Sequence, residues 1–416
     1  MQTTLEHQAL EYHRYVRPGK IAIAVTKPVA TQHDLALAYS PGVAAPCLEI
    51  QKDPATAYDY TAKGNLVAVI TNGTAVLGLG DIGALAGKPV MEGKAVLFKR
   101  FAGIDSFDIE VDENDPDKLV DIIAAISPTF GGINLEDIKA PECFYVERKL
   151  RERLDIPVFH DDQHGTAIVV GAGFLNALRL TGKAIDHVKL VCSGAGAAAI
   201  ACLDLLVDLG IRRENVFVCD SKGVLSKSRT DLNAEKQAWA QDTTATTLAD
   251  ALRGADVLLG LSGPGLVNDN HIRSMASKPI VFALANPEPE IRPERVKAVV
   301  EDAIVATGRS DYPNQINNAL CFPYLFRAAL DTGARQINQE MKRACVTALA
   351  ELAQNSPEFG PDAIVPTLLD NRLLTTITPK IAEAAMESGI ARKKLNMVRY
   401  RAELEGLHSG LAGEEA

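Results

Sequence analysis

The chain has 416 residues, of which 47% are hydrophobic and 23% charged, and it carries a formal net charge of −10. This composition is typical of a soluble globular protein of two domains, and the negative charge argues against nucleic acid or an anionic membrane surface as partner. The N-terminus lacks the apolar core of a signal peptide, and no run reaches the roughly 18 apolar residues of a membrane span, so we expect a cytoplasmic protein. The seven scattered cysteines form no C-x-x-C pair, which indicates reduced thiols rather than disulfides or zinc.

The first residues predict a helix followed by an arm. Residues 4–16 have the pattern of a short amphipathic helix, and residues 17–46 are interrupted by four prolines, which predicts an extended arm. Arms of this kind often pack on a neighbouring subunit, so we expect a homodimer. Within the arm, Tyr39 precedes the turn sequence Ser40-Pro41-Gly42, which would hold its phenol at a defined place. Taken alone, a tyrosine before a turn is more often structural than catalytic.

A glycine-rich stretch follows the first apolar run. Asn72-Gly73 stands between two apolar runs, which predicts a β-hairpin. Gly78, Gly80 and Gly83 match G-x-G-x-x-G, but the preceding strand belongs to this hairpin, and the helix that should follow is cut at 87–89 by Gly-Lys-Pro. We therefore expect these glycines to allow close backbone approach near a substrate.

A helix is predicted from Met91 to Phe101, and it carries Lys94 in otherwise apolar surroundings. Burial there would lower the pKa of Lys94 towards that of a usable base. The alternative is a lysine whose ammonium reaches water.

Four carboxylates gather between residues 134 and 167. Glu136 and Asp137 end one apolar-rich run, and Asp161 and Asp162 follow the short run 156–160, before a helix that we expect from Gly165. Ligands of open α/β sheets bind at such strand ends. On extended backbone the four acids could surround one hard cation, Mg²⁺ or Mn²⁺. The alternative is a set of ordinary solvated loop acids or helix caps.

The second half has the pattern of a dinucleotide-binding domain. Gly194, Gly196 and Ala199 form G-x-G-x-x-A directly after a strand and before an uninterrupted helix, and Asp220 ends the next strand, where a ribose hydroxyl would bind. Further strand and helix alternation predicts an α/β protein with an N-terminal substrate domain (1–161), a Rossmann-like doubly wound parallel sheet (162–395) and a tail (396–416) that looks frayed. Helical segments at 341–354 and 379–391 are expected to close back over the first domain.

Several motifs together resemble the malic enzymes. AYSPGVA, GLGDIG, MEGKAVLF, NLEDI, HDDQHGTA, SGAGAAA, ALANP and GRSDYPNQINN occur in the family's order over residues 15–390. The resemblance extends to the malic-enzyme half of bacterial hybrid proteins whose second, phosphotransacetylase-like region is absent here. It implies oxidative decarboxylation of (S)-malate to pyruvate and CO₂ with a nicotinamide coenzyme and a divalent metal.

The resemblance also implies roles for individual residues. Tyr39 is similar to the general acid, Lys94 to the general base, and Asp161 to the acid that orients the lysine. Glu136, Asp137 and Asp162 are similar to the metal ligands, and Asn286, Asn317 and Asn318 to substrate contacts. The expected coenzyme contacts are Thr166, Gly194, Gly196, Ala197, Ala198, Ala199, Asp220, Ser221, Lys222, Lys236, Ser262 and Asn286. Larger members place a carboxylate-binding arginine where this chain has Ala75.

The coenzyme is predicted from opposing charges near Asp220. This acid would accept from the 2′-hydroxyl of NAD, whereas Ser221, Lys222 and Lys236 stand where a 2′-phosphate would lie. We favour NADP over NAD, with the two lysines as the discriminating residues. The alternatives to a malic enzyme are a malolactic-type decarboxylase, an amino-acid dehydrogenase and a non-catalytic NAD(P)-binding regulator.

Overall fold

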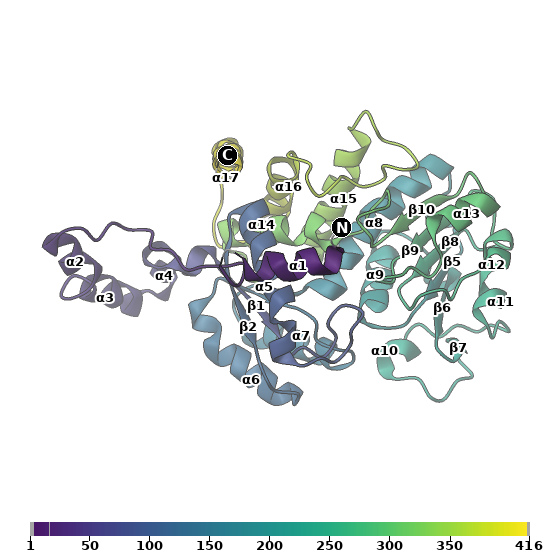
Figure 1. Ribbon diagram of the computed structural model, residues 1–416, viewed down its shortest axis with the longest axis horizontal. Helices are drawn as coiled ribbons and strands as arrows, with labels where there is room; N and C mark the ends of the chain where they lie inside the picture. Colours follow the sequence, from purple (N-terminus) through teal and green to yellow (C-terminus); the bar gives the residue numbers. More distant parts are fainter. Residues whose placement is uncertain (1–3, 16, 414–416) are drawn as a thin grey trace.

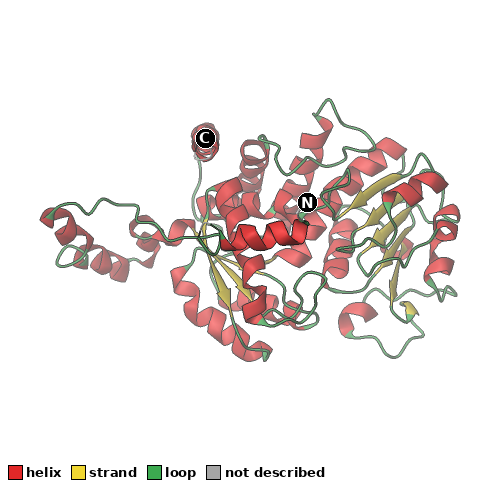
Figure 2. Cartoon of the chain, in the orientation of Figure 1, coloured by secondary structure: helices red, strands yellow, loops and turns green. Residues whose placement is uncertain are grey.

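The computed structural model describes residues 4–15 and 17–413, and it contains two parallel sheets with helices packed on them (Figures 1 and 2). The four-stranded first sheet has the order β2-β1-β3-β4, and all its pairs are parallel. Its strands are β1 (Leu66–Thr71), β2 (Asp105–Glu110), β3 (Gly132–Leu135) and β4 (Val158–His160). Leu135 pairs with His160, so β3 and β4 end side by side and the residues that follow both strands leave the same edge.

The second sheet has six strands in the order β10-β9-β8-β5-β6-β7, which is a Rossmann-like arrangement in which only β7 runs antiparallel. The strands are β5 (Leu190–Ser193), β6 (Val216–Asp220), β7 (Gly223–Val224), β8 (Val257–Gly260), β9 (Ile280–Ala283) and β10 (Ile304–Thr307). Apart from β6 and β7, every residue of these strands is buried, as expected for a parallel sheet covered on both faces. The predicted α/β class is thereby confirmed.

One long helix, α8 (Asp161–Thr181), runs from the edge of the first sheet into the second half of the chain. It packs against α9 (Ala197–Asp208) and α15 (Gln339–Gln354). The other α-helices that lie between strands along the chain are α5 (Ala84–Ala102), α6 (Pro116–Ile126), α7 (Glu142–Arg153), α10 (Ala234–Gln237), α11 (Leu248–Leu252), α12 (Asp269–Arg273) and α13 (Pro293–Val299). None of the helices in the described ranges is both long and apolar enough to cross a bilayer.

One C-terminal helix, α14 (Phe322–Thr332), packs on α5 of the first half of the chain. Helices α15 and α16 (Leu373–Glu387), which contain most of the segments that we predicted to do so, pack mainly on each other, on α14 and, for α15, on α8. Phe98 of α5 meets Phe322 and Phe326 of α14 edge-on, with ring centroids 4.7 and 5.3 Å apart. One hydrophobic core therefore runs from Val67 of the first sheet to the last helices.

Two predictions in the glycine-rich stretch are wrong. No hairpin forms at Asn72-Gly73, because β1 pairs only with the parallel strands β2 and β3; Gly73, at φ +69°, instead accepts from the amides of Ile82 and Gly83. The helix begins at Ala84 rather than Met91 and contains Pro89. Proline leaves the carbonyl four residues earlier without a donor, and that residue, Leu85, is exposed to solvent.

The tail prediction is also wrong. Residues 397–413 form the helix α17 (Met397–Gly413), which packs on α16. The Tyr400 hydroxyl donates to Asp331 at 2.7 Å, and Leu404 is 2% exposed, so the helix is anchored by one buried hydrogen bond and one apolar face.

The N-terminal arm is more helical than predicted, although α1 (Leu5–Arg14) matches the expectation. The arm at residues 17–46 contains α2 (Gln32–Ala38) and the first residues of α3 (Ala44–Lys52), and the short α4 (Ala57–Tyr60) follows it. Figure 1 shows α2 and α3 projecting from the body of the molecule. Helices α1 to α4 contain no buried residue. Thirteen of the twenty-one large exposed hydrophobic side chains among the described residues lie between Leu5 and Tyr60.

A candidate metal and catalytic centre at the edge of the first sheet

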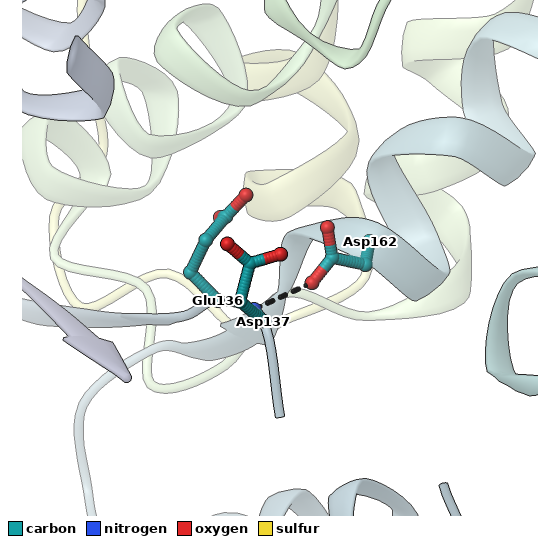
Figure 3. A group of neighbouring side chains, drawn as sticks. All are labelled: Glu136, Asp137 and Asp162. Atoms are coloured by element: carbon teal, nitrogen blue, oxygen red, sulfur yellow. Dashed lines mark hydrogen bonds between the residues drawn. The ribbon is translucent and has the colours of Figure 1, made fainter. Parts of the chain in front are cut away.

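Three carboxylates converge where β3 and β4 end. Glu136 and Asp137 directly follow β3, Asp162 lies in the first turn of α8, and one ligand atom from each lies within 4.8 Å of the others. The Asp137 amide donates to the Asp162 carboxylate at 2.8 Å, which fixes the two chain segments relative to one another (Figure 3). Asp137 has φ +53°, a left-handed conformation that aspartate tolerates better than most residues.

The acid pair at 161–162 stands on helical backbone rather than on the extended backbone that we predicted, and α8 begins at Asp161 rather than Gly165. Successive residues on a helix point in different directions, so Asp161 and Asp162 reach different partners. Asp162 faces Asp137, whereas Asp161, fully buried, faces Lys94. Gly165 makes room for this, because a Cβ there would lie 2.0 Å from the Asp161 carboxylate.

Lys94 on α5 completes the cluster. Its ammonium lies 2.7 Å from Asp161 and 2.9 Å from Glu136, and 4.5 Å from the centre of the Phe322 ring, and the residue is 7% exposed. Burial lowers the pKa of Lys94, but the surrounding carboxylates outweigh burial and raise it above its ordinary value. The predicted lowering of this pKa is therefore wrong, since the charges of the surrounding acids outweigh the effect of burial.

Burial and mutual repulsion also raise the pKa values of the acids. The pKa is about 7 for Glu136 and Asp161, about 9 for Asp137 and about 6 for Asp162, with burial as the largest cause in each case. One oxygen of the Asp137 carboxylate is buried without a hydrogen-bond partner. A group of converging, poorly satisfied carboxylate oxygens fits a hard divalent cation such as Mg²⁺ or Mn²⁺.

The predicted dinucleotide turn lies between β5 and α9. Gly194 has φ +120°, and a Cβ there would lie 2.2 Å from the carbonyl of Leu261, so only glycine fits. Gly196 precedes the helix, and Ala197, Ala198 and Ala199 form its first turn, where free amides can receive a phosphate. Ser262 bonds to Ser193 across the turn at 2.9 Å, through the two hydroxyls.

The basic residues beyond β6 form a compact charged group with two acids. Arg229 donates to both oxygens of Asp220, at 2.8 and 3.1 Å, and to Asp231, while Lys236 contacts Asp220 at 3.0 Å and Lys222 contacts Asp231 at 2.7 Å. Burial raises the pKa of Asp220, but the hydrogen bonds from Arg229 and Lys236 outweigh it and lower the pKa to about 2. Three cations against two carboxylates leave the group with a net positive charge. Ser221 lies next to Asp220 and is exposed.

The remaining predicted residues lie at two places. Thr166 lies on α8. Asn318 packs against the preceding residue of that helix, because a Cβ at Gly165 would be 2.9 Å from the Asn318 Cβ. Asn317 caps the following short turn by accepting from the amide of Ala319 at 2.9 Å. The carbonyl of Asn286 lies close to Gly78, which accounts for that glycine as a site of close backbone approach.

Of the three predicted catalytic residues, Lys94 and Asp161 meet in this cluster and Tyr39 does not. It ends α2 on the projecting arm and is 70% exposed (Figure 1).

Sequence reasoning missed three buried polar residues around the site. Glu290, fully buried, accepts from the Ser262 and Ala285 amides and so joins two loops beside the dinucleotide turn. Glu147 and Lys342 lie on either side of His164 behind the acid cluster. The only sequence signal of Glu147 and Lys342 is a charged residue at a helix position that otherwise faces the core, and Glu290 lies in a loop before α13.

The geometry defines a two-domain nicotinamide-nucleotide-binding protein with an acidic centre at the first sheet. Two family descriptions match the chain, "Malic enzyme, N-terminal domain" over residues 18–151 and "Malic enzyme, NAD binding domain" over residues 163–389. The chain belongs to the malic enzyme family.

Individual relatives are close over nearly the whole chain. An NADP-dependent malic enzyme of Haemophilus influenzae is 61% identical over 95% of this chain and 54% of its own length. An NAD-dependent malic enzyme of Rhizobium meliloti is 59% identical over 94% of this chain and 53% of its own length. This chain thus spans about half the length of these relatives.

A relative of similar length is also known. An NADP-dependent malic enzyme of Halomonas elongata is 56% identical over 92% of this chain and 94% of its own length. The crystal structure of a malic enzyme from Pyrococcus horikoshii superposes with a TM-score of 0.92 at 45% identity, over 98% of this chain and 96% of that one.

Proposed function

We propose that this protein catalyses the oxidative decarboxylation of (S)-malate to pyruvate and CO₂ with reduction of NADP. The observation that carries the proposal is the convergence of Glu136, Asp137 and Asp162 beside a buried lysine. Family membership and the NADP-dependent relatives support the same activity. A non-catalytic regulator would have no need to bury four acids with one lysine, which is costly unless the group binds a cation.

Glu136, Asp137 and Asp162 would hold Mg²⁺ or Mn²⁺, which as a bound Lewis acid would polarise the C2 oxygen and stabilise negative charge there after CO₂ leaves. Lys94, whose protonated form a neighbouring divalent cation would disfavour, would take the proton from the C2 hydroxyl as C2 gives up a hydride to the nicotinamide. Asp161 orients the Lys94 amine through their 2.7 Å contact. The phenol of Tyr39, supplied by a partner subunit as proposed below, would then protonate C3 to give pyruvate. The amides of Asn286, Asn317 and Asn318 are proposed to contact the substrate.

NADP is the proposed coenzyme because the group around Asp220 has a net positive charge. Arg229 and Lys236 neutralise Asp220, so this acid no longer repels a 2′-phosphate, and Lys222 is 67% exposed beside it. Charge-assisted hydrogen bonds to such a phosphate would each contribute roughly 1.5 to 3 kcal/mol. An NAD-dependent relative at 59% identity makes NAD the alternative. The test is the ratio of kcat/KM for the two coenzymes in the parent and in Lys222→Ala with Lys236→Ala, which we expect to move towards NAD. A parent that prefers NAD would refute the assignment.

We also propose a homodimer in which Tyr39 of the partner subunit completes each site. The arm has no buried residue in α2 or α3, and it exposes Leu35, Leu37 and Tyr39 by 46%, 61% and 70%. A monomer would leave these side chains in water, whereas exchange of the arm across a two-fold axis would bury them.

Mixed dimers test this arrangement. Tyr39→Phe chains should protonate C3 slowly and Lys94→Ala chains should not oxidise malate, so neither forms pyruvate at the parent rate. The two chains are unfolded together and refolded, and pyruvate formation is measured. If Tyr39 acts on the partner's site, about a quarter of all sites regain both residues, and activity returns to that extent. If Tyr39 acts within its own chain, no site is complete and pyruvate formation stays no faster than in the separate variants.

The activity itself is tested by the absorbance of reduced nicotinamide with (S)-malate, Mn²⁺ and each coenzyme. We expect reduced coenzyme and pyruvate in equal amounts. A malolactic-type decarboxylase would instead give lactate without free reduced coenzyme, and a regulator would bind coenzyme without any turnover.

A further inference from the structure

The first turn of α8 carries Asp161 and Asp162, and a buried polar relay lies directly behind it. Glu147 of α7 accepts from both sides of this turn: from the His160 amide at 3.3 Å, and from His164 Nε2 with its two carboxylate oxygens, at 2.8 and 2.9 Å. Lys342 of α15 contacts His164 Nδ1 at 3.1 Å. Glu147 and Lys342 are each 7% exposed, so the relay is largely shielded from bulk solvent.

The donors and acceptors of the relay fit only one arrangement. A lysine ammonium has hydrogens and no lone pair, so Nδ1 of His164 accepts from Lys342. Nε2 then carries the ring hydrogen and donates to Glu147. The positive and negative charges of Lys342 and Glu147 are therefore joined through one imidazole, and each partner is satisfied by the next.

The relay joins three separate parts of the chain. Glu147 belongs to the helix between β3 and β4, His164 to α8 and Lys342 to the C-terminal helices. Glu147 accepts from the amide of His160 and from the ring of His164, and so bridges the two ends of residues 160–164, the segment from which Asp161 and Asp162 project.

We propose that Glu147, His164 and Lys342 are positioning residues for the metal centre, which hold the first turn of α8 in the orientation that brings Asp162 to Asp137 and Asp161 to Lys94. This inference rests on the metal site of the proposed function. None of the three residues contacts the cluster of Glu136, Asp137 and Asp162 through its side chain in the described structure. Partners that orient a ligand in this way typically change metal affinity by 10- to 100-fold when removed.

The experiment compares two substitutions of His164. His164→Leu has a similar size and no polar atom, so it breaks both contacts. His164→Gln offers an acceptor to Lys342 and a donor to Glu147, and should restore the relay. The matched control is Glu152→Gln, since Glu152 lies on the same helix as Glu147 and its side chain is 58% exposed. The readouts are the Kd for Mn²⁺, measured by electron paramagnetic resonance of the free ion, and the Kd for NADP.

We expect His164→Leu to raise the Kd for Mn²⁺ at least 10-fold and to leave the Kd for NADP within about 2-fold, while His164→Gln and Glu152→Gln stay close to the parent. Amide hydrogen exchange at residues 160–164 should accelerate in metal-free His164→Leu. Lys342→Met provides the same test through a second residue if His164→Leu fails to fold. Unchanged Mn²⁺ affinity in a folded relay variant, or no recovery in His164→Gln, overturns the inference. A parent that binds no Mn²⁺ at all would overturn the proposed metal centre instead.

Discussion

The carboxylate cluster makes the metal-free protein less stable as the pH rises, and Asp137→Asn should remove much of that dependence. The pKa of Asp137 is about 9 in the folded protein because of burial and of repulsion by Asp162 and Glu136, against an ordinary value of 3.8. Between these values the folded chain binds a proton that the unfolded chain has lost, so the free energy of unfolding falls by about 1.4 kcal/mol per pH unit. From pH 5 to pH 8 the loss is on the order of 4 kcal/mol. Asparagine has no titratable carboxyl proton and has nearly the same shape as aspartate. It also tolerates the left-handed backbone conformation of this position.

The measurement is urea unfolding of parent and variant at pH 5, 6, 7 and 8 in the presence of a chelator, followed by circular dichroism. We expect the parent to lose stability steadily and Asp137→Asn to lose far less, so that the variant becomes the more stable protein at pH 8. Mn²⁺ at 100 times its Kd should add about 2.7 kcal/mol to the parent and nothing to the variant. Equal pH slopes for the two proteins would refute the reasoning, since they would mean that Asp137 is not held protonated by its neighbours.

Three further results are expected. Asp162→Asn should abolish turnover while NADP still binds, because the dinucleotide turn is separate from the acids; normal turnover at saturating metal would disprove the metal assignment. Tyr39→Phe should retain malate oxidation but slow the exchange of methyl protons in pyruvate, and unchanged exchange would remove the tyrosine from the acid role. Tyr400→Phe should remove the 2.7 Å hydrogen bond to Asp331, which keeps its contacts with Arg327, and so lower stability by about 0.5 to 1.5 kcal/mol, measured by urea unfolding, with no change in KM.

The features that could be predicted from the sequence are those that depend on short segments of the chain. The dinucleotide turn was predictable because Gly194 and Gly196 stand between a buried strand and an uninterrupted helix, and the structure has β5 and α9 there. The acids were predictable as a group because each pair directly follows a short apolar run, and the structure has β3 and β4 there as parallel neighbours whose ends coincide.

The errors arise where contacts distant in the chain decide the local structure. Asn72-Gly73 forms a hairpin only if the next strand is adjacent, and here β1 takes parallel partners instead. The glycine and proline in α5 did not end that helix, because its buried face packs on the first sheet and α14. The environment of Lys94, and the neutralisation of Asp220 by Arg229, depend on side chains that meet only after folding.

Helix α8 also limits how this molecule can move. Its first turn carries the acids at the edge of the first sheet, and its remaining turns are packed between α9 and α15 within a hydrophobic core that the two halves share. A rigid rotation of one sheet relative to the other would therefore disrupt the packing of core side chains and separate Asp162 from Asp137. We expect any opening and closing around a ligand to occur in the outer loops of the second sheet and in the arm. Helix α8 should keep its position during these movements and not act as a hinge.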